Sequence, residues 1–269
     1  MAGVATVTLA SGLTLSYVDQ GDESAPVLLL LPGPTDSWRS YQQVVDRLPR
    51  SIRAIAVSQR GHGDSDKPAT GYRVQDFAAD AVFLLDALGV KRAVLAGHSG
   101  SCLVVRRVAI DRPERVAGLI LEASPTTLRG DPRLQDFVTS VVSGLEDPIG
   151  LDFARQFVLD TSSEDVPAVV VEELAQELLT VPARVWREVF ADLLEYDDTG
   201  ELGRIDAPAV LLWGTADTLV TRAMQDELVK SIPGAELITY DGMGHTPRWD
   251  DPARFSADIA AFVERLQRP

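Results

Sequence analysis

One serine in the chain stands where its hydroxyl could act as a nucleophile. Ser99 lies in the segment Leu95–Ser101 (Leu-Ala-Gly-His-Ser-Gly-Ser), between an apolar run typical of a buried strand and an amphipathic run typical of a helix. A serine on such a tight turn has a strained backbone and needs very small residues two positions to either side, which Gly97 and Ser101 provide. The turn presents the hydroxyl near a helix N-terminus, which favours developing negative charge. The segment predicts a nucleophile elbow; the alternative is a glycine-rich turn with an inert serine.

A nucleophilic serine needs a base, and the base needs a group that orients it. His245 is flanked by glycine in Gly242–Pro247, directly after the last strand-like run, and Asp217 follows the strand-like run before it. The chain order Ser, Asp, His is typical of a nucleophile elbow on a mostly parallel sheet. We therefore expect Ser99, Asp217 and His245 to form a catalytic triad. A structural histidine, and an aspartate that caps a helix near Arg222, are the alternatives.

The composition limits the partners and the compartment. The 269 residues hold 40 Asp and Glu against 25 Lys and Arg, for a net charge of −15. This charge disfavours nucleic acid and anionic membranes and leaves a small-molecule substrate as the expected partner, with a homo-oligomer left open. The single cysteine, the lack of a basic and apolar leader, and a longest apolar run of only Val27–Leu31 predict a cytoplasmic protein. Three histidines without a Cys/His cluster predict no zinc site.

Alternating strand-like and helix-like runs predict an α/β fold with a mostly parallel sheet. Continuous apolar runs such as Val27–Leu31 are typical of strands buried on both faces. The expected strands are 4–9, 13–19, 27–31, 52–57, 93–96, 117–121, 209–213 and 236–240, and the expected helices are 38–48, 77–88, 103–110, 223–231 and 252–266.

Strand-like patterns are missing between about Pro125 and Gly203. Four amphipathic runs occupy this segment, and prolines 132, 148, 167 and 182 precede or begin them, as suits a first helical turn. The sequence predicts a helical cap over residues 125–203, inserted into a core domain made of residues 1–124 and 204–269. The expected cap helices are 133–145, 149–159, 166–179 and 183–196.

The elbow and triad motifs resemble those of the α/β-hydrolase family, and the resemblance covers nearly the whole chain. Ser58–Ser65 (Ser-Gln-Arg-Gly-His-Gly-Asp-Ser) is similar to that family's D-x-R-G-x-G-x-S turn, with Ser58 in place of aspartate, and Asp111–Val116 resembles its helix-to-strand joint. The resemblance implies an eight-stranded mostly parallel sheet with a helical cap, and a serine hydrolase, esterase- or lactonase-like, without cofactor or metal. The implied substrate is a small, largely apolar ester or lactone, or a related acyl or carbon–carbon bond.

The loop after the third strand departs from the family pattern. That pattern is H-G-x, in which the backbone N–H of x donates to the oxyanion. Here Pro32 replaces the histidine, Gly33 is kept, and Pro34, which has no N–H, stands at x. The N–H of Gly100 is left as the expected oxyanion donor. Losing one such donor costs roughly 10²–10³ in rate.

Three explanations of this departure remain open. A hydroxyl of Thr35, Ser37 or Ser101 compensates, or the loop is displaced so that Thr35 supplies its N–H, or the reaction needs less oxyanion stabilisation than ester hydrolysis. The departure also keeps two other functions open. One is a non-hydrolytic enzyme on this scaffold, such as a cofactor-free dioxygenase or a lyase, and the other is a receptor or pseudoenzyme that binds in the cleft without turnover.

Several other residues have two interpretations. Glu122 follows the sixth strand, where some members of the family place their acid, so it is the alternative to Asp217. His98 either packs beside the elbow or touches the ligand. His62 and Cys102 are expected to be structural, and the four tryptophans are expected in the core unless they line the cleft.

Overall fold

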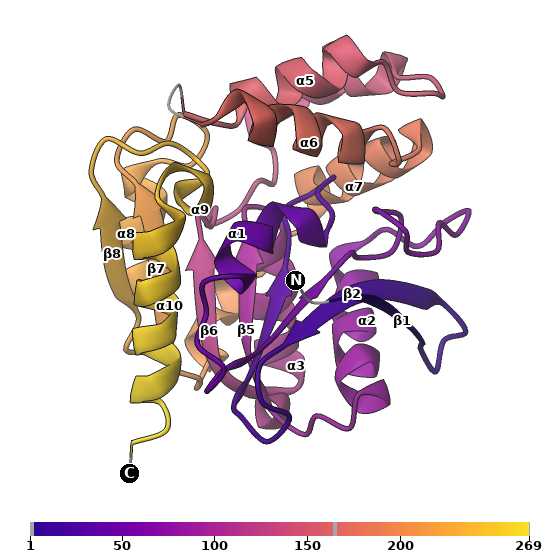
Figure 1. The fold of residues 1–269 in the computed structure, drawn as a ribbon. Coiled ribbons are helices and arrows are strands. Elements are labelled where there is room, and N and C mark those ends of the chain that lie inside the picture. Colours follow the sequence, from indigo (N-terminus) through magenta and orange to yellow (C-terminus); the bar gives the residue numbers. More distant parts are fainter. Residues whose placement is uncertain (1–2, 164–165, 269) are drawn as a thin grey trace.

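Eight strands form one sheet in the order β1-β2-β4-β3-β5-β6-β7-β8 in the computed structural model, which describes residues 3–163 and 166–268 (Figure 1). β2 runs antiparallel to both β1 and β4, and all neighbours from β4 to β8 are parallel. The expected eight-stranded, mostly parallel sheet is therefore confirmed. The strands are β1 Val4–Thr8, β2 Thr14–Gln20, β3 Val27–Leu31, β4 Arg53–Val57, β5 Ala93–His98, β6 Val116–Glu122, β7 Ala209–Gly214 and β8 Glu236–Tyr240.

Helices cover both faces of the sheet and divide the apolar core in two. In β3 every residue is buried; Leu28 and Leu30 pack into one core, and Leu29 and Leu31 into the other, as the period of two in a strand requires. Helices α1 (Gln42–Val45) and α10 (Pro252–Arg265) cover the first face. Helices α2 (Val74–Ala87), α3 (Ser101–Asp111) and α8 (Arg222–Ser231) cover the second.

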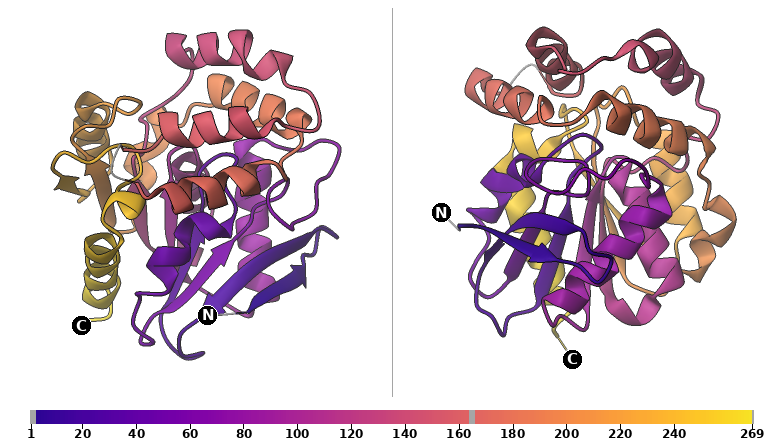
Figure 2. Two further views of the ribbon diagram at one scale, coloured as in Figure 1. Left: turned by 45° about the horizontal axis from the view of Figure 1, so that its top comes forward. Right: turned by 90° about the vertical axis from the view of Figure 1, so that its right-hand side faces the viewer.

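The segment between β6 and β7 is helical in its described part and lies over the end of the sheet at which the parallel strands finish (Figures 1 and 2). Its core is aromatic: Trp186 is fully buried, with the rings of Phe153, Phe157 and Phe190 around it. Trp186 thus holds the helical layer together. The helices are α4 Pro132–Ser140, α5 Leu151–Asp160, α6 Ala168–Leu178 and α7 Ala183–Glu195.

Element boundaries differ from expectation where local hydrogen bonds end a helix early. The helix expected over 38–48 is a 3₁₀ turn at Trp38–Tyr41, capped by the Ser37 side chain, followed by the single turn of α1. Helix α4 stops at Ser140, and a short 3₁₀ turn at Val142–Gly144 follows.

The prolines of the segment between β6 and β7 do not all begin a helix as expected. Pro132 occupies the first turn of α4, whereas Pro167 and Pro182 are N-cap residues and Pro148 precedes the N-cap of α5.

Within the described ranges, no helix has the length and apolarity needed to cross a bilayer.

Candidate active site

The turn between β5 and α3 has the strained geometry expected of a nucleophile elbow. Ser99 has φ +53°, in the left-handed region that is costly for a residue with a side chain. Its carbonyl accepts the N–H of Cys102 at 2.9 Å, which starts the helix. A Cβ on Gly97 would lie 2.6 Å from the carbonyl oxygen of Ser101, so only glycine fits two residues before the serine.

Two side chains of α3 that follow the serine are structural. The Ser101 hydroxyl donates to the carbonyl of Pro32 at 2.5 Å and accepts from Gln59 Nε2 at 3.0 Å, so it is not a free oxyanion donor. The Cys102 thiol is fully buried against the carbonyls of Gly97 and Glu122, and burial raises its pKa to about 12.

Asp217 lies against the imidazole of His245. Its Oδ2 is 2.8 Å from Nδ1 of His245, while its Oδ1 accepts the N–H groups of Leu219 and Val220 at 2.8 and 3.0 Å. A carboxylate at this position fixes the tautomer in which Nδ1 carries the proton and Nε2 is a free base. The alternative of a helix cap does not hold, because Thr221 caps α8 and Arg222 pairs with Asp226.

Glu122, the alternative acid, faces a different partner. It is completely buried; Oε1 accepts from Arg248 Nη1 at 3.0 Å and Oε2 from the Tyr41 hydroxyl at 3.1 Å. Burial raises the pKa of Glu122, and the guanidinium of Arg248 opposes that rise. The structure therefore places Asp217, and not Glu122, on the imidazole.

Arg248 connects Glu122 to the loop after β3. The arginine belongs to α9 (Pro247–Asp250), is fully buried, and donates through Nη2 to Oδ2 of Asp36 at 3.1 Å. Burial raises the pKa of Asp36 to about 6, although Arg248 lowers it. Sequence reasoning missed this cluster because its members are 86 to 212 residues apart and no local pattern links them.

His98 is fixed between the elbow and the His245 loop. Its Nε2 donates to the carbonyl of His245 at 3.1 Å, and the two rings lie 4.9 Å apart. Nδ1 is therefore an unprotonated acceptor; it is buried without a partner, and a Cβ on Gly33 would come within 2.5 Å of it. Burial holds the pKa of His98 well below its ordinary value. His98 therefore packs beside the elbow, and it also lines the cavity above it.

Pro34, in the loop after β3, packs against the backbone of the elbow. A Cβ on Gly100 would lie 2.7 Å from Cγ of Pro34, which shows how closely the ring approaches the elbow backbone. The next residue, Thr35, has φ +78°, and its N–H donates to Nε2 of His62 at 3.1 Å. The N–H of Thr35 is thus bonded to His62 and does not face the cavity as a free donor.

The other hydroxyl candidates of this loop also lie elsewhere. The Ser37 side chain accepts the N–H of Arg39, and neither Thr35 nor Ser37 lines the cavity above the elbow that is described below. His62 donates from Nδ1 to the carbonyl of Arg60 at 2.7 Å, and burial lowers its pKa to about 4. Ser58 accepts the N–H of Trp38 at 3.2 Å, consistent with a structural role for the Ser58–Ser65 turn.

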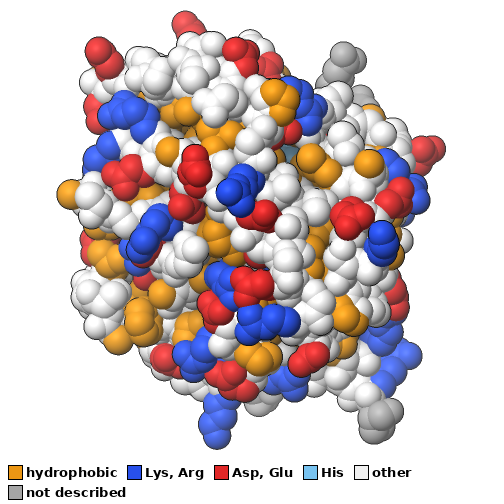
Figure 3. Space-filling view, turned by 180° about the vertical axis from the view of Figure 1, so that it is seen from behind, with side chains coloured by type: hydrophobic (Ala, Val, Ile, Leu, Met, Phe, Trp, Pro, Cys, Tyr) orange, Lys and Arg blue, Asp and Glu red, His pale blue; other side chains and the backbone are white. Residues whose placement is uncertain are grey.

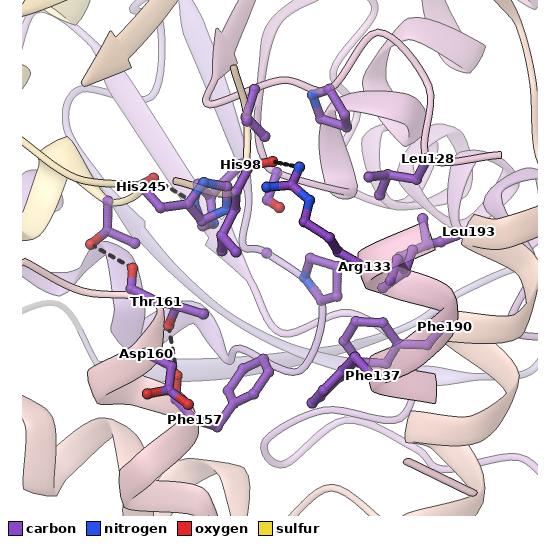
Figure 4. Close-up of a pocket in the computed structure, with 18 of the residues that line it drawn as sticks. His98, Leu128, Arg133, Phe137, Phe157, Asp160, Thr161, Phe190, Leu193 and His245 are labelled. Carbon is purple, nitrogen blue, oxygen red and sulfur yellow. Dashed lines mark hydrogen bonds between the residues drawn. The ribbon is translucent and has the colours of Figure 1, made fainter. Parts of the chain in front are cut away.

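A cavity of about 330 Å³ opens above the elbow. Figure 4 shows His98 and His245 on one side of it and the rings of Phe137, Phe157 and Phe190 on another. Its wall is mostly apolar, which suits a ligand with little polar surface. The lining includes Gly33, Pro34, Asp36, His98, Ser99, Leu128, Arg133, Leu134, Phe137, Phe157, Phe190, Leu193, Leu219, Val220, His245 and Trp249. Of the four tryptophans, Trp249 is the one that reaches this cavity.

Arg133 is the basic side chain in the cavity wall. Its Nη1 and Nη2 donate to the carbonyls of Thr218 and Leu219 at 2.7 and 3.0 Å, which ties α4 to the loop after β7.

Among the described residues no His, Cys, Asp and Glu side chains cluster in a way that could hold a metal ion. The back of the molecule carries interspersed acidic and basic side chains (Figure 3).

Comparison with known proteins shows which family has this architecture. A family model described as "alpha/beta hydrolase fold" matches residues 26–252. The chain is 31% identical to a non-heme chloroperoxidase of Streptomyces lividans, over 96% of this chain and 99% of that protein. It is 26% identical to 3-oxoadipate enol-lactonase 2 of Acinetobacter baylyi, over 96% of both. The crystal structure of an esterase, RhEst1 from Rhodococcus sp. ECU1013, superposes with a TM-score of 0.86 at 27% identity and covers 99% of this chain and 100% of that one.

Proposed function

The chain belongs to the α/β-hydrolase family, and within that family we propose that it is a serine hydrolase of small, largely apolar esters or lactones. The observation that carries the proposal is the 2.8 Å hydrogen bond between Asp217 and Nδ1 of His245, in a cavity that Ser99 also lines. This bond leaves Nε2 of His245 unprotonated on a ring that lines the same cavity as the serine. The esterase and lactonase among the relatives support the same reaction class.

In the proposed mechanism, Nε2 of His245 takes the proton from the Ser99 hydroxyl as the oxygen attacks the substrate carbonyl. Asp217 stabilises the imidazolium that forms and keeps the ring oriented. The Gly100 N–H donates to the oxyanion. The leaving group departs with the proton from His245, and a water molecule, activated by the same base, then hydrolyses the acyl-enzyme.

The apolar cavity wall supports the proposed acyl specificity. Phe137, Phe157 and Phe190 come from three helices of the segment between β6 and β7, and burying an acyl chain against them removes apolar surface from water. A volume of about 330 Å³ suits a small molecule. We propose that residues 125–203 act as a cap that sets specificity over a core of residues 1–124 and 204–269.

A fluorophosphonate probe tests the nucleophile. We expect it to label Ser99 in the native protein, and Ser99→Ala to prevent labelling and abolish hydrolysis of short p-nitrophenyl esters. Ser101→Ala is the matched control, because this hydroxyl lies two residues away but is bonded to Pro32 and Gln59. Undiminished ester hydrolysis by purified Ser99→Ala would refute the proposal, whereas loss of labelling in Ser101→Ala alone would point to the wrong serine.

A further inference from the structure

The backbone on the β3 side of the elbow offers little to a developing oxyanion. Pro34, which packs against Gly100, has no N–H, and the N–H of Thr35 is held by His62. A Cβ on the residue before them, Gly33, would lie 2.5 Å from Nδ1 of His98, and the carbonyl of Gly33 accepts the N–H of Asp36 at 3.1 Å. At the elbow itself, the N–H of Gly100 has no acceptor in the described part of the chain, so it is free to donate.

Side chains that line the cavity do not replace the missing donor. The donor hydrogens of four of them are already bonded to backbone carbonyls: His98 to His245, Thr161 to Phe157, Thr246 to Thr161, and Trp249 to Ser40. Arg133 is anchored on the loop after β7, whereas the oxyanion forms between the ends of β3 and β5. The guanidinium is thus already bonded to two backbone carbonyls of a loop that lies two strands from β5 in the sheet order.

An acyl transfer that lacks one oxyanion donor proceeds readily only when the acyl compound is itself activated. Removing one donor costs roughly 10²–10³ in rate, and an acidic leaving group offsets that loss because it carries away the negative charge early. On the basis of the proposed acyl-enzyme route, we propose that the substrates are activated acyl compounds, namely enol or aryl esters and enol lactones, and that simple alkyl esters are poor substrates.

The two half-reactions respond differently to this deficit. In acylation the Ser99 oxygen bonds to the acyl carbon, the bond to the enol or phenol oxygen breaks, and the serine proton passes through His245 to that oxygen. In deacylation water attacks the same carbon, one proton of the water passes through His245 to Ser99, and the acid is released. The acyl-enzyme is an alkyl ester of serine, so its hydrolysis meets the full deficit whatever the first leaving group was. Deacylation therefore limits turnover of activated substrates.

A series of butyrate esters of p-nitrophenol, phenol and ethanol measures both effects in the native enzyme. We expect a burst of about one p-nitrophenol per Ser99, and similar kcat values for the two aryl esters because they share one acyl-enzyme. We expect kcat/KM for ethyl butyrate to be lower than for phenyl butyrate by at least about 10²-fold, the size of a missing donor. Hydrolysis of ethyl butyrate within tenfold of phenyl butyrate would overturn the inference.

Pro34→Ala supplies an N–H at the deficient position. We expect this variant to raise kcat/KM for ethyl butyrate by roughly 10-fold or more, to raise it less for p-nitrophenyl butyrate, and to shrink the burst because deacylation accelerates. Leu193→Ala is the matched control, since Leu193 also packs against Gly100 but its truncation adds no donor. The control should not favour ethyl butyrate over the aryl esters.

The outcomes separate this inference from the proposed function. A folded Pro34→Ala variant with an unchanged ratio of alkyl to aryl activity overturns the inference and leaves the serine mechanism intact. Should Pro34→Ala not fold, the leaving-group series on the native enzyme decides alone. Aryl ester hydrolysis that persists in Ser99→Ala instead contradicts the proposed function.

Discussion

The backbone N–H of Thr35 donates to Nε2 of His62 at 3.1 Å, so a histidine from the turn after β4 holds the loop that faces the elbow. Nδ1 of His62 donates in turn to the carbonyl of Arg60, which fixes the tautomer. The ring must be neutral to accept the Thr35 N–H, and burial keeps it neutral by lowering its pKa to about 4. Neutral His62 therefore helps to hold the loop after β3 in its place beside the elbow.

Replacement of His62 should reveal how much the protonation of this side chain makes folding stability depend on pH. The unfolded chain binds a proton at His62 below about pH 6.5 but the folded chain only below about 4, so stability falls as the pH drops through this window. The difference corresponds to about 3 kcal/mol. We expect native protein to lose about that much relative to His62→Gln between pH 6.5 and 4 in urea unfolding. A constant difference between the two proteins across this range would contradict the linkage.

The Asp36 carboxyl should change folding stability with pH in the direction opposite to His62. Its folded pKa of about 6 lies above its ordinary 3.8, so the folded state binds the extra proton and gains stability as the pH falls from 6 toward 4. This gain masks part of the His62 effect in the native protein. The comparison must therefore be made between native protein and variant at each pH, and not read from one curve.

Asp217→Asn should prevent His245 from acting as a base while keeping the contacts that residue 217 makes with its own loop. The amide oxygen can still accept from Leu219 and Val220, but the amide nitrogen then donates to Nδ1 of His245 and forces the proton onto Nε2. We expect kcat to fall by roughly 10³–10⁴ with little change in melting temperature. Glu122→Gln is the comparison, because that side chain contacts Arg248; a larger loss of kcat there than in Asp217→Asn would make Glu122 the acid.

Arg248→Met should be among the most destabilising single changes in the chain. It leaves the buried carboxylates of Glu122 and Asp36 without their cation, and breaking a buried ion pair costs about 3–5 kcal/mol. Arg265→Met is the control, since its pair with Glu236 is half exposed and is worth at most about 1 kcal/mol. Urea unfolding measures both, and equal losses would show that the Arg248 cluster is not energetically special.

Gly33→Ala should disturb catalysis through His98. The new methyl group would lie 2.5 Å from Nδ1 of that ring, so the ring must move and its hydrogen bond to the His245 carbonyl must weaken. We expect kcat to fall by about 10- to 100-fold, because small displacements of a catalytic base are costly. Gly203→Ala, at a site with no neighbour within 4 Å, should leave kcat unchanged. Unaltered kcat in Gly33→Ala would show that the His98 contact does not position His245.

Local sequence signals predicted the elements and the elbow well. Buried apolar runs such as Val27–Leu31 specify strands by themselves, and the spacing of Gly97, Ser99 and Ser101 reflects a steric requirement at one turn. The position of Asp217 beside His245 followed from sheet order, since both loops leave the same edge. The first two features depend on short segments of the sequence, and the third depends on the order of two neighbouring strands.

Features that depend on long-range side-chain contacts could not be predicted. Nothing near Arg248 indicates that its partners are Glu122 and Asp36, and nothing near Thr35 indicates that His62 occupies its N–H. The 3₁₀ turn at Trp38–Tyr41 was likewise hidden, because its apolar residues have helical spacing while a serine cap and the packing of the loop set its geometry.

The anchorage of Arg133 couples two parts of the protein that must otherwise be considered separately. Its guanidinium grips the carbonyls of Thr218 and Leu219, and the N–H of Leu219 is one of the two that hold Asp217. The carbonyl of Thr218 and the N–H of Leu219 belong to the same peptide unit, so Arg133 and Asp217 hold that unit from opposite ends. A shift of α4 would therefore reach the Asp217–His245 pair through a single peptide unit.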